Sequence, residues 1–289
     1  MKIIQKAVLN TAGRLFAQSG GLFSLLILVD LTSLALVGQM TALIAAPSFF
    51  STLATASLGL ATTVIVARTS GKALRSAHIS TELSSLAARR TTWAMAAAIP
   101  FTLYEAYRDA EGLAITAAVT TLSLAQIYFQ STNVIQGAVI RGLGDFDRYA
   151  KTQVASGTLR FLVLLPAIWG SQSLWHYLAA GLLAQVLINV YSHSEVKKSV
   201  HLHDSALHES YRWKGSARDE ASDFIRNNQL SNVLAAAVTW LFTSTLSAYG
   251  SAADVGRWAL LTRTLNILLF LPQRFADVTL TEVSKLTHA

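Results

Sequence analysis

The chain lacks cysteine altogether, and it contains only four prolines and few charged residues. Without cysteine, disulfides, thiolate metal ligands and cysteine nucleophiles are excluded. Charged residues make up 13% of the 289 positions, whereas about 25% is usual in soluble domains. The deficit is concentrated in long runs, since Phe161–Ser194 has no Asp, Glu, Lys or Arg and Ala110–Ile140 has only Glu111. Crossing a hydrocarbon core takes roughly 20 apolar residues, so these runs predict a polytopic membrane protein.

Apolar residues, at 52% of the chain, gather into stretches that are too long for barrel strands and show no strand-like alternation. Backbone polar groups in lipid must be satisfied within the segment, which favours helices. We therefore expect an all-α membrane bundle of about eight transmembrane helices. The expected spans are 11–32, 38–67, 91–107, 112–140, 149–170, 175–194, 228–249 and 255–279.

Lysine and arginine alternate between the connections. They are frequent before the first span and in the second, fourth and sixth connections, and nearly absent from the others. The positive-inside rule then predicts a cytoplasmic N-terminus in a multi-pass protein. This topology accounts for the net charge of +7, so no nucleic-acid partner is expected. The first apolar segment lacks a cleavage site and is expected to be a membrane helix rather than a signal peptide.

The polar stretch 195–226 divides the chain into a six-helix lobe at 1–194 and a two-helix unit at 227–289. It contains residues that could bind a metal: His201, His203, Asp204, His208 and Glu209. A tetrahedral metal site needs a folded frame, and nothing in the sequence predicts one here. We therefore expect a solvated cytoplasmic linker with no metal.

A short signature occurs twice. Ala35-Leu36-Val37-Gly38-Gln39-Met40 is repeated as Ala253-Asp254-Val255-Gly256-Arg257-Trp258, 218 residues later. Each copy lies in a turn after one apolar segment and opens a second one. If the bundle is duplicated, this period places the start of the second copy near Asn227 and leaves it incomplete.

Three arginines lie within predicted spans: Arg14, Arg160 and Arg263. Charged groups at membrane depth are costly and usually face an interior or a water-filled cavity. Guanidinium groups sharing one cavity would attract an anionic substrate, because they pair bidentately with phosphate. The alternatives are a carboxylate or backbone partner for Arg160 and Arg263, and snorkelling to the headgroups for Arg14.

Asn133 and Gln136 are candidate substrate-binding amides in the fourth span, where Gln126 also lies, and Gln185 and Asn189 lie in the sixth. The alternative for all five amides is hydrogen bonding between helices, which the composition of the spans favours. Asp30 is a candidate ion-coupling residue near the outer end of the first span. The alternative is that Asp30 acts as a cap at the level of the lipid headgroups.

The sequence contains no catalytic constellation. A Ser–His–Asp set, a glycine-rich phosphate loop and paired intramembrane carboxylates are all missing. We therefore expect no enzymatic activity and no cofactor.

The chain resembles the polysaccharide flippases of the multidrug/oligosaccharidyl-lipid/polysaccharide exporter superfamily. Three stretches carry the resemblance: Ser57-Leu58-Gly59-Leu60 with Ala67-Arg68, Ile140-Arg141-Gly142-Leu143-Gly144-Asp145-Phe146, and Tyr249-Gly250-Ser251-Ala252-Ala253-Asp254-Val255-Gly256-Arg257-Trp258. The resemblance implies two six-helix lobes around a cavity. It also implies flipping of a polyprenyl-diphosphate-linked oligosaccharide, such as an O-antigen or lipopolysaccharide precursor, across the bacterial inner membrane. The basic groups of the family's cavity would correspond to Arg160, Arg263 and Arg14, by their chemistry rather than by an aligned motif.

The chain departs from that pattern because at least four helices of the second lobe are missing. We expect a truncated flippase whose partners are membrane lipid and either a second copy of the chain or another polysaccharide-assembly protein. Two alternatives stay open. One is a cation-coupled exporter of small organic cations, which predicts acidic residues in the cavity. The other is a non-transporting scaffold subunit for polysaccharide assembly.

Overall fold

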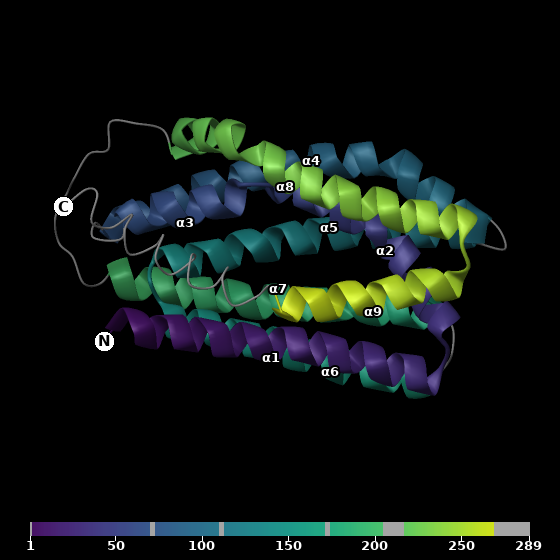
Figure 1. The fold of residues 1–289 in the computed structure, drawn as a ribbon. Coiled ribbons are helices and arrows are strands. Elements are labelled where there is room, and N and C mark those ends of the chain that lie inside the picture. The colour runs from purple at the N-terminus through teal and green to yellow at the C-terminus, as the bar shows by residue number, and fades with distance from the viewer. Residues whose placement is uncertain (1, 70–72, 110–112, 171–173, 205–216, 269–289) are drawn as a thin grey trace.

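The computed structural model describes residues 2–69, 73–109, 113–170, 174–204 and 217–268. Within these ranges every regular element is an α-helix, and the helices lie side by side along one long axis (Figure 1). They are α1 (Lys2–Leu31), α2 (Leu34–Thr55), α3 (Leu58–Thr69), α4 (Ala73–Asp109), α5 (Leu113–Gly142), α6 (Phe146–Gly170), α7 (Leu174–Asp204), α8 (Ala217–Tyr249) and α9 (Ala252–Leu268). The predicted all-α bundle is confirmed.

The second predicted span, 38–67, is broken into two helices, α2 and α3. At the break Ser57 adopts a left-handed backbone conformation (φ 58°), which costs a residue other than glycine about 1 kcal/mol or more. Its hydroxyl accepts a hydrogen bond from Asn232 Nδ2 on α8 at 3.2 Å. Arg90 Nη2 on α4 donates to the Leu53 carbonyl at 3.2 Å. The break therefore exposes polar backbone that neighbouring helices satisfy.

The helices run alternately up and down the bundle. The beginnings of α1, α4, α6 and α8 lie at one end, together with the ends of α3, α5 and α7 (Figure 1). The described helix ends that flank the predicted basic connections thus share one end of the molecule. Which side of a membrane that end faces stays a prediction.

Two serines, Ser33 and Ser251, each lie two residues before a copy of the repeated signature. Leu36 N donates to Ser33 Oγ at 3.1 Å, and Asp254 N donates to Ser251 Oγ at 3.2 Å. Both are N-caps, which satisfy backbone N–H groups that have no partner within the helix. In the second copy Asp254 Oδ2 also accepts a hydrogen bond from Ser251 N at 3.1 Å. The side chains of Ser251 and Asp254 therefore each accept a hydrogen bond from the backbone N–H of the other residue. The repeat therefore extends to its capping residue.

The two copies of the signature contact each other directly. A Cβ added to Gly38 on α2 would overlap the carbonyl oxygen of Ala252 on α9, and one added to Gly256 would overlap that of Leu34. Ala252 stands to Gly256 as Leu34 stands to Gly38, so the contact is reciprocal. Close backbone approach through glycine is a common way for membrane helices to associate. The repeat thus forms a close contact between α2 and α9.

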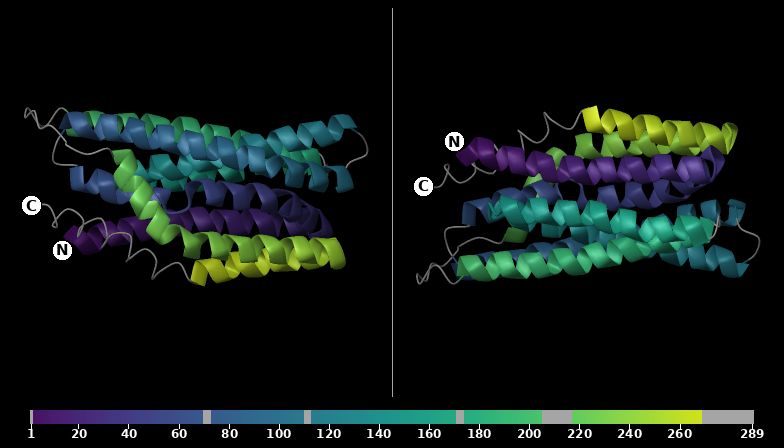
Figure 2. Two further views of the ribbon diagram at one scale, coloured as in Figure 1. Left: turned by 90° about the horizontal axis from the view of Figure 1, so that it is seen from above. Right: turned by 90° about the horizontal axis from the view of Figure 1, so that it is seen from below.

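A second seam of small residues joins α1 to α6. A Cβ on Gly157 would lie 2.9 Å from Ala17 Cα, and one on Gly13 would lie 2.9 Å from Ala150 Cα. Figure 2 shows α1 alongside α6 and the α8–α9 hairpin along one side of the bundle. Helix α9 contacts both α1 and α2.

The predicted linker 195–226 is largely helical where it is described. Helix α7 continues to Asp204 and α8 begins at Ala217. Ala221 and Ile225 are buried in a core with residues of α3, α4 and α5, and Glu195 is also buried. Helices therefore run across both predicted boundaries, and the division into two units and a linker stays a prediction. The histidine cluster extends into 205–216, outside the described residues.

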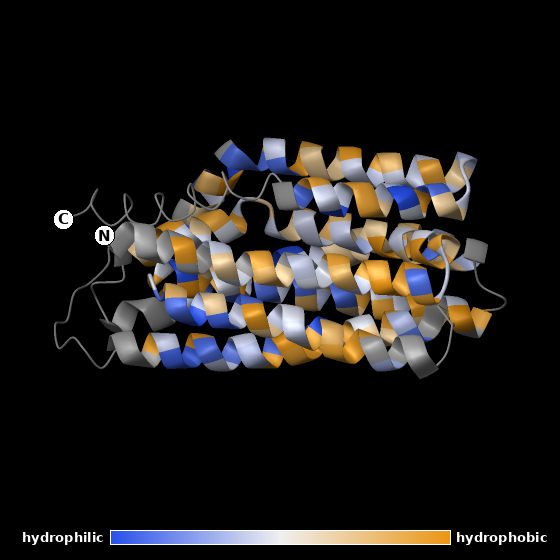
Figure 3. Ribbon diagram, turned by 60° about the horizontal axis from the view of Figure 1, so that its bottom comes forward, coloured by the Kyte–Doolittle hydropathy of each residue, from blue (hydrophilic) through white to orange (hydrophobic). Residues whose placement is uncertain are grey.

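Three described stretches are long and apolar enough to cross a membrane by length and composition: Thr11–Leu31, Leu34–Arg68 and Asn228–Tyr249. Helix α6 contains several charged residues. These include Arg148, Lys151 and Arg160. Large hydrophobic side chains are exposed on the outside of the bundle, and hydrophobic segments occur on each helix (Figure 3).

Candidate functional site

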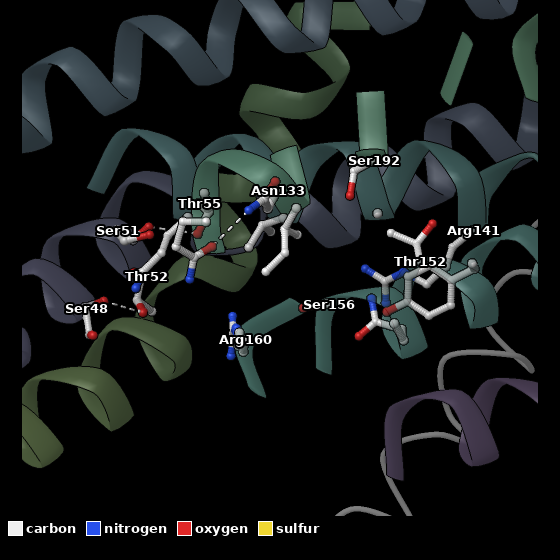
Figure 4. Close-up of a pocket in the computed structure, with 17 residues that line it drawn as sticks. Ser48, Ser51, Thr52, Thr55, Asn133, Arg141, Thr152, Ser156, Arg160 and Ser192 are labelled. Atoms are coloured by element: carbon white, nitrogen blue, oxygen red, sulfur yellow. Dashed lines mark hydrogen bonds between the residues drawn. The ribbon is translucent and has the colours of Figure 1, made fainter. Parts of the chain in front are cut away.

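A cavity of about 360 Å³ lies between α2, α5, α6 and α7 (Figure 4). Its lining residues recur at helical spacing, so each helix contributes one polar face. They are Ser48, Ser51, Thr52 and Thr55 on α2, Gln130, Asn133, Val134, Gly137 and Arg141 on α5, Tyr149, Thr152, Gln153, Ser156 and Arg160 on α6, and Gln185, Ile188 and Ser192 on α7. Two of them are basic and none is acidic. The cavity therefore offers positive charge and hydrogen-bond donors.

Arg160 is the predicted site residue with the clearest place in this cavity. Its Nε atom is shielded from solvent and has no hydrogen-bond partner among the described residues. No carboxylate of the described chain forms an ion pair with it, which argues against the predicted alternative of a carboxylate partner. Arg160 is half-buried, and a guanidinium that is partly removed from water without a counter-charge is unfavourable, so an anion in the cavity would compensate it.

Arg141 is a second cavity cation that the sequence analysis did not select. Its guanidinium carbon lies 5.3 Å from the centre of the Tyr149 ring, a distance at which cation and ring attract each other. Figure 4 shows Arg141 and Arg160 apart, with Thr152 and Ser156 between them. The signal that could have found Arg141 is its helical spacing from Asn133 and Gly137.

Asn133 lies in the same cavity and is held by two other amides. Its Nδ2 donates to Gln185 Oε1 at 3.0 Å, and its Oδ1 accepts from Asn189 Nδ2 at 3.2 Å. The predicted interhelical hydrogen bonding of these amides is confirmed. The network fixes α5 against α7 and keeps the Asn133 amide at the cavity wall.

The other candidate residues lie apart. Gln136 lines a different cavity, on the opposite face of α5. Arg263 on α9 does not line the cavity, although its charge is close enough to act on Arg160. Asp30 is exposed near the end of α1. Arg14 lies on α1, and its side chain is outside the described part.

An adjoining cavity of about 320 Å³ lies between α2 and the α8–α9 hairpin. It shares Ser48 and Thr52 with the first cavity. The aromatic residues on its wall are Phe49, Trp240 and Trp258, and the Phe49 and Trp240 rings stack with their centres 4.7 Å apart. One side of α2 thus faces the basic polar cavity, and the adjacent side of α2 faces the cavity with aromatic walls.

An ion cluster holds α6 and α7 together at the basic end of the bundle. Arg148 Nη1 lies 3.1 Å from Glu195 Oε2, and Lys198 Nζ lies 2.7 Å from Glu195 Oε1. Arg148 also pairs with Asp145 at 2.9 Å, and Ser199 donates to Asp145 Oδ2 at 2.9 Å. Burial opposes the charge on Glu195, but Lys198 and Arg148 together hold its pKa below the ordinary value.

Among the residues that the structure describes, no group of histidine and acidic side chains could hold a metal ion. The cavity lining contains only oxygen and nitrogen donors that are neutral or cationic. Its chemistry is that of binding an anion or a polar group.

Two solved structures share this fold. One, described as protein A, superposes with a TM-score of 0.72 at 16% identity, covering 98% of this chain and 64% of its own. The other, a MATE in complex with MaD5, superposes with a TM-score of 0.59 at 19% identity, covering 98% of this chain and 66% of its own. This chain thus spans about two thirds of their length. No family model matches the sequence, and no curated protein is similar to it in sequence. The molecule is a polytopic helical bundle with a MATE-like fold, and membership of the flippase family stays a prediction.

Proposed function

We propose that this chain is part of a membrane exporter that flips polyprenyl-diphosphate-linked oligosaccharides across the bacterial inner membrane for surface polysaccharide synthesis. The observation that carries the proposal is the cavity with Arg141 and Arg160 and no acidic lining residue. A phosphate group suits a guanidinium group such as that of Arg160, because the two can pair bidentately. The hydroxyl and amide groups around them suit the hydroxyls of sugars.

The aromatic chamber beside the cavity supports a substrate with two chemical parts. Sugar rings stack their apolar faces on aromatic side chains such as Trp258, while their hydroxyls reach polar neighbours such as Thr239 and Thr262. A diphosphate at Arg160 and a glycan toward Trp258 is a consistent arrangement, because Ser48 and Thr52 border both chambers.

A second candidate function is export of organic cations. The likeness to a MATE structure and the aromatic rings of the second chamber favour it, since aromatic faces attract cations. The two cavity arginines oppose it by like-charge repulsion. Asp30 remains a candidate coupling residue, although it lies away from both chambers.

The test is transport by the purified protein in liposomes. Wild type is expected to move a fluorescent polyprenyl-diphosphate oligosaccharide into a compartment protected from an external quencher. Arg160→Gln is expected to abolish this movement, whereas Arg257→Gln, which removes an exposed arginine paired with Asp254, is expected to preserve it.

Other results would redirect the assignment. Accumulation of a fluorescent organic cation without movement of the lipid-linked sugar would establish the exporter alternative. Absence of both activities, with retention of polysaccharide-assembly proteins from membranes, would favour the scaffold role.

A further inference from the structure

A separate cavity of about 360 Å³ lies between α4, α5 and α7. It shares no lining residue with the arginine cavity, because the two use opposite faces of α5. The lining is rich in hydroxyl groups. It consists of Ser80, Thr81, Ser84, Ala87, Ala88 and Thr91 on α4, Tyr128, Thr132, Ile135, Gln136 and Val139 on α5, and His193 and Val196 on α7.

Gln136 is the residue that points to a ligand here. Its side chain is 9% exposed, and its Oε1 atom has no hydrogen-bond partner among the described residues. Most buried polar atoms are hydrogen-bonded, so an orphaned carbonyl calls for a donor. The cavity holds far more than one water molecule, which occupies about 30 Å³. A donor group of a larger ligand would fit.

The rim of the cavity carries positive charge. His193 is exposed on α7, and Lys197, one helical turn further on, is exposed too. Across the cavity on α4, Arg89 is exposed next to the lining residue Ala88. Basic rims between membrane helices suit lipid phosphates.

An exposed tryptophan lies near the cavity on α4. Trp93, one turn beyond Arg89 on α4, is 70% exposed. Exposed tryptophan beside basic residues is typical of the boundary between headgroups and hydrocarbon. The rim therefore lies where a lipid headgroup would be.

We propose that this cavity binds a phospholipid whose headgroup carries an ammonium group. The phosphate lies at the rim by Arg89 and Lys197, and the ammonium reaches inward to donate to Gln136 Oε1. This site is distinct from the arginine cavity and does not depend on what that cavity transports.

The test measures lipid retention by native mass spectrometry of the full chain from vesicles of equal phosphatidylethanolamine and phosphatidylglycerol. Wild type is expected to retain phosphatidylethanolamine several-fold more than phosphatidylglycerol. Gln136→Leu is expected to lower phosphatidylethanolamine retention about tenfold, since one charge-assisted hydrogen bond is lost. The matched control is Gln126→Leu, the same change on the same helix at a position that lines neither cavity.

Two further variants keep the proposal falsifiable if Gln136→Leu does not fold. Gln136→Glu is expected to raise the preference for phosphatidylethanolamine, because a carboxylate pairs with the ammonium. The double substitution Arg89→Gln with Lys197→Gln is expected to weaken retention of both lipids. Equal retention of the two lipids by wild type, or unchanged selectivity in both Gln136 variants, would overturn the proposal.

Discussion

Helix α6 has two faces that approach their neighbours very differently. On one face Gly157 and Ala150 let α1 come close enough for backbone contact. On the other face Thr152, Ser156 and Arg160 border a cavity of about 360 Å³. The same helix thus packs through small apolar residues where it is joined and carries polar residues where it leaves space. Substitutions on the first face are therefore expected to affect folding, and substitutions on the second face are expected to affect binding.

The largest effect is expected from Gly157→Val on the packed face. The new side chain meets Ala17 Cα on the neighbouring backbone, so the two helices must separate. We expect a loss of about 3 kcal/mol in the free energy of unfolding, seen as lost monodisperse protein in detergent chromatography and a lower melting temperature.

The matched control is Gly181→Ala on α7, where no heavy atom lies within 4 Å of the added Cβ. Because alanine favours helix, that change is expected to stabilise by about 0.5–1 kcal/mol. Equal stability of the two variants would contradict the assignment of the seam.

On the cavity face, Arg160→Gln is expected to lower lipid-linked oligosaccharide transport at least about tenfold, because a charged contact to phosphate is lost. Its melting temperature is expected to match or exceed that of wild type, since a half-buried unpaired charge is removed. Arg160→Ala should also impair export in complemented cells more than Arg14→Ala. Near-normal export by both variants would refute the cavity assignment.

A smaller effect is expected at Glu195, which joins the start of α6 to α7. The pKa of Glu195 is lowered in the folded protein. The ionised carboxylate therefore makes its full contribution to the stability of the folded protein above its unfolded pKa. This contribution is lost as pH falls through the folded pKa. Melting curves between pH 7 and pH 3 should therefore show wild type losing more stability than Glu195→Gln. At pH 7 the variant is expected to be less stable by about 1–2 kcal/mol, and parallel curves would argue against the ion cluster.

The smallest effect is expected from the caps of the repeated signature. Ser33→Ala removes the acceptor of Leu36 N and should cost about 1 kcal/mol, with no change in transport. Ser33→Asp keeps an acceptor at the same place and is expected to restore the melting temperature. If Ser33→Asp did not restore the melting temperature, Ser33 would not stabilise the protein as an N-cap.

Most of the helices could be predicted from the sequence, because long uncharged runs and alternating basic connections depend only on local composition. The break at Ser57 could not, since its conformation depends on Asn232, 175 residues away. The helical extension of α7 and α8 was also missed. There the polar residues face one another in an ion cluster, and small apolar ones such as Ala221 enter the core.

The site was only partly predictable. Arg160 stood out as a charge within an apolar run, but Arg141 did not, since it lies at a helix end where basic residues are common. Asn133 and Gln136 are three residues apart and appeared equivalent in sequence. The direction in which each points depends on how α5 is rotated against α6 and α7, which only the packing determines.

The reciprocal contact of Gly38 with Ala252 and of Gly256 with Leu34 links positions far apart in sequence. It has the form of a twofold interface folded into one polypeptide. Two copies that were free to diverge would accumulate substitutions independently. Here a larger residue at either glycine is opposed by the backbone of the other copy, so drift in one copy is limited by the other. The two copies differ at Asp254 and Arg257, which stand where the first copy has Leu36 and Gln39. Both charged side chains reach solvent, away from the contact between the glycines.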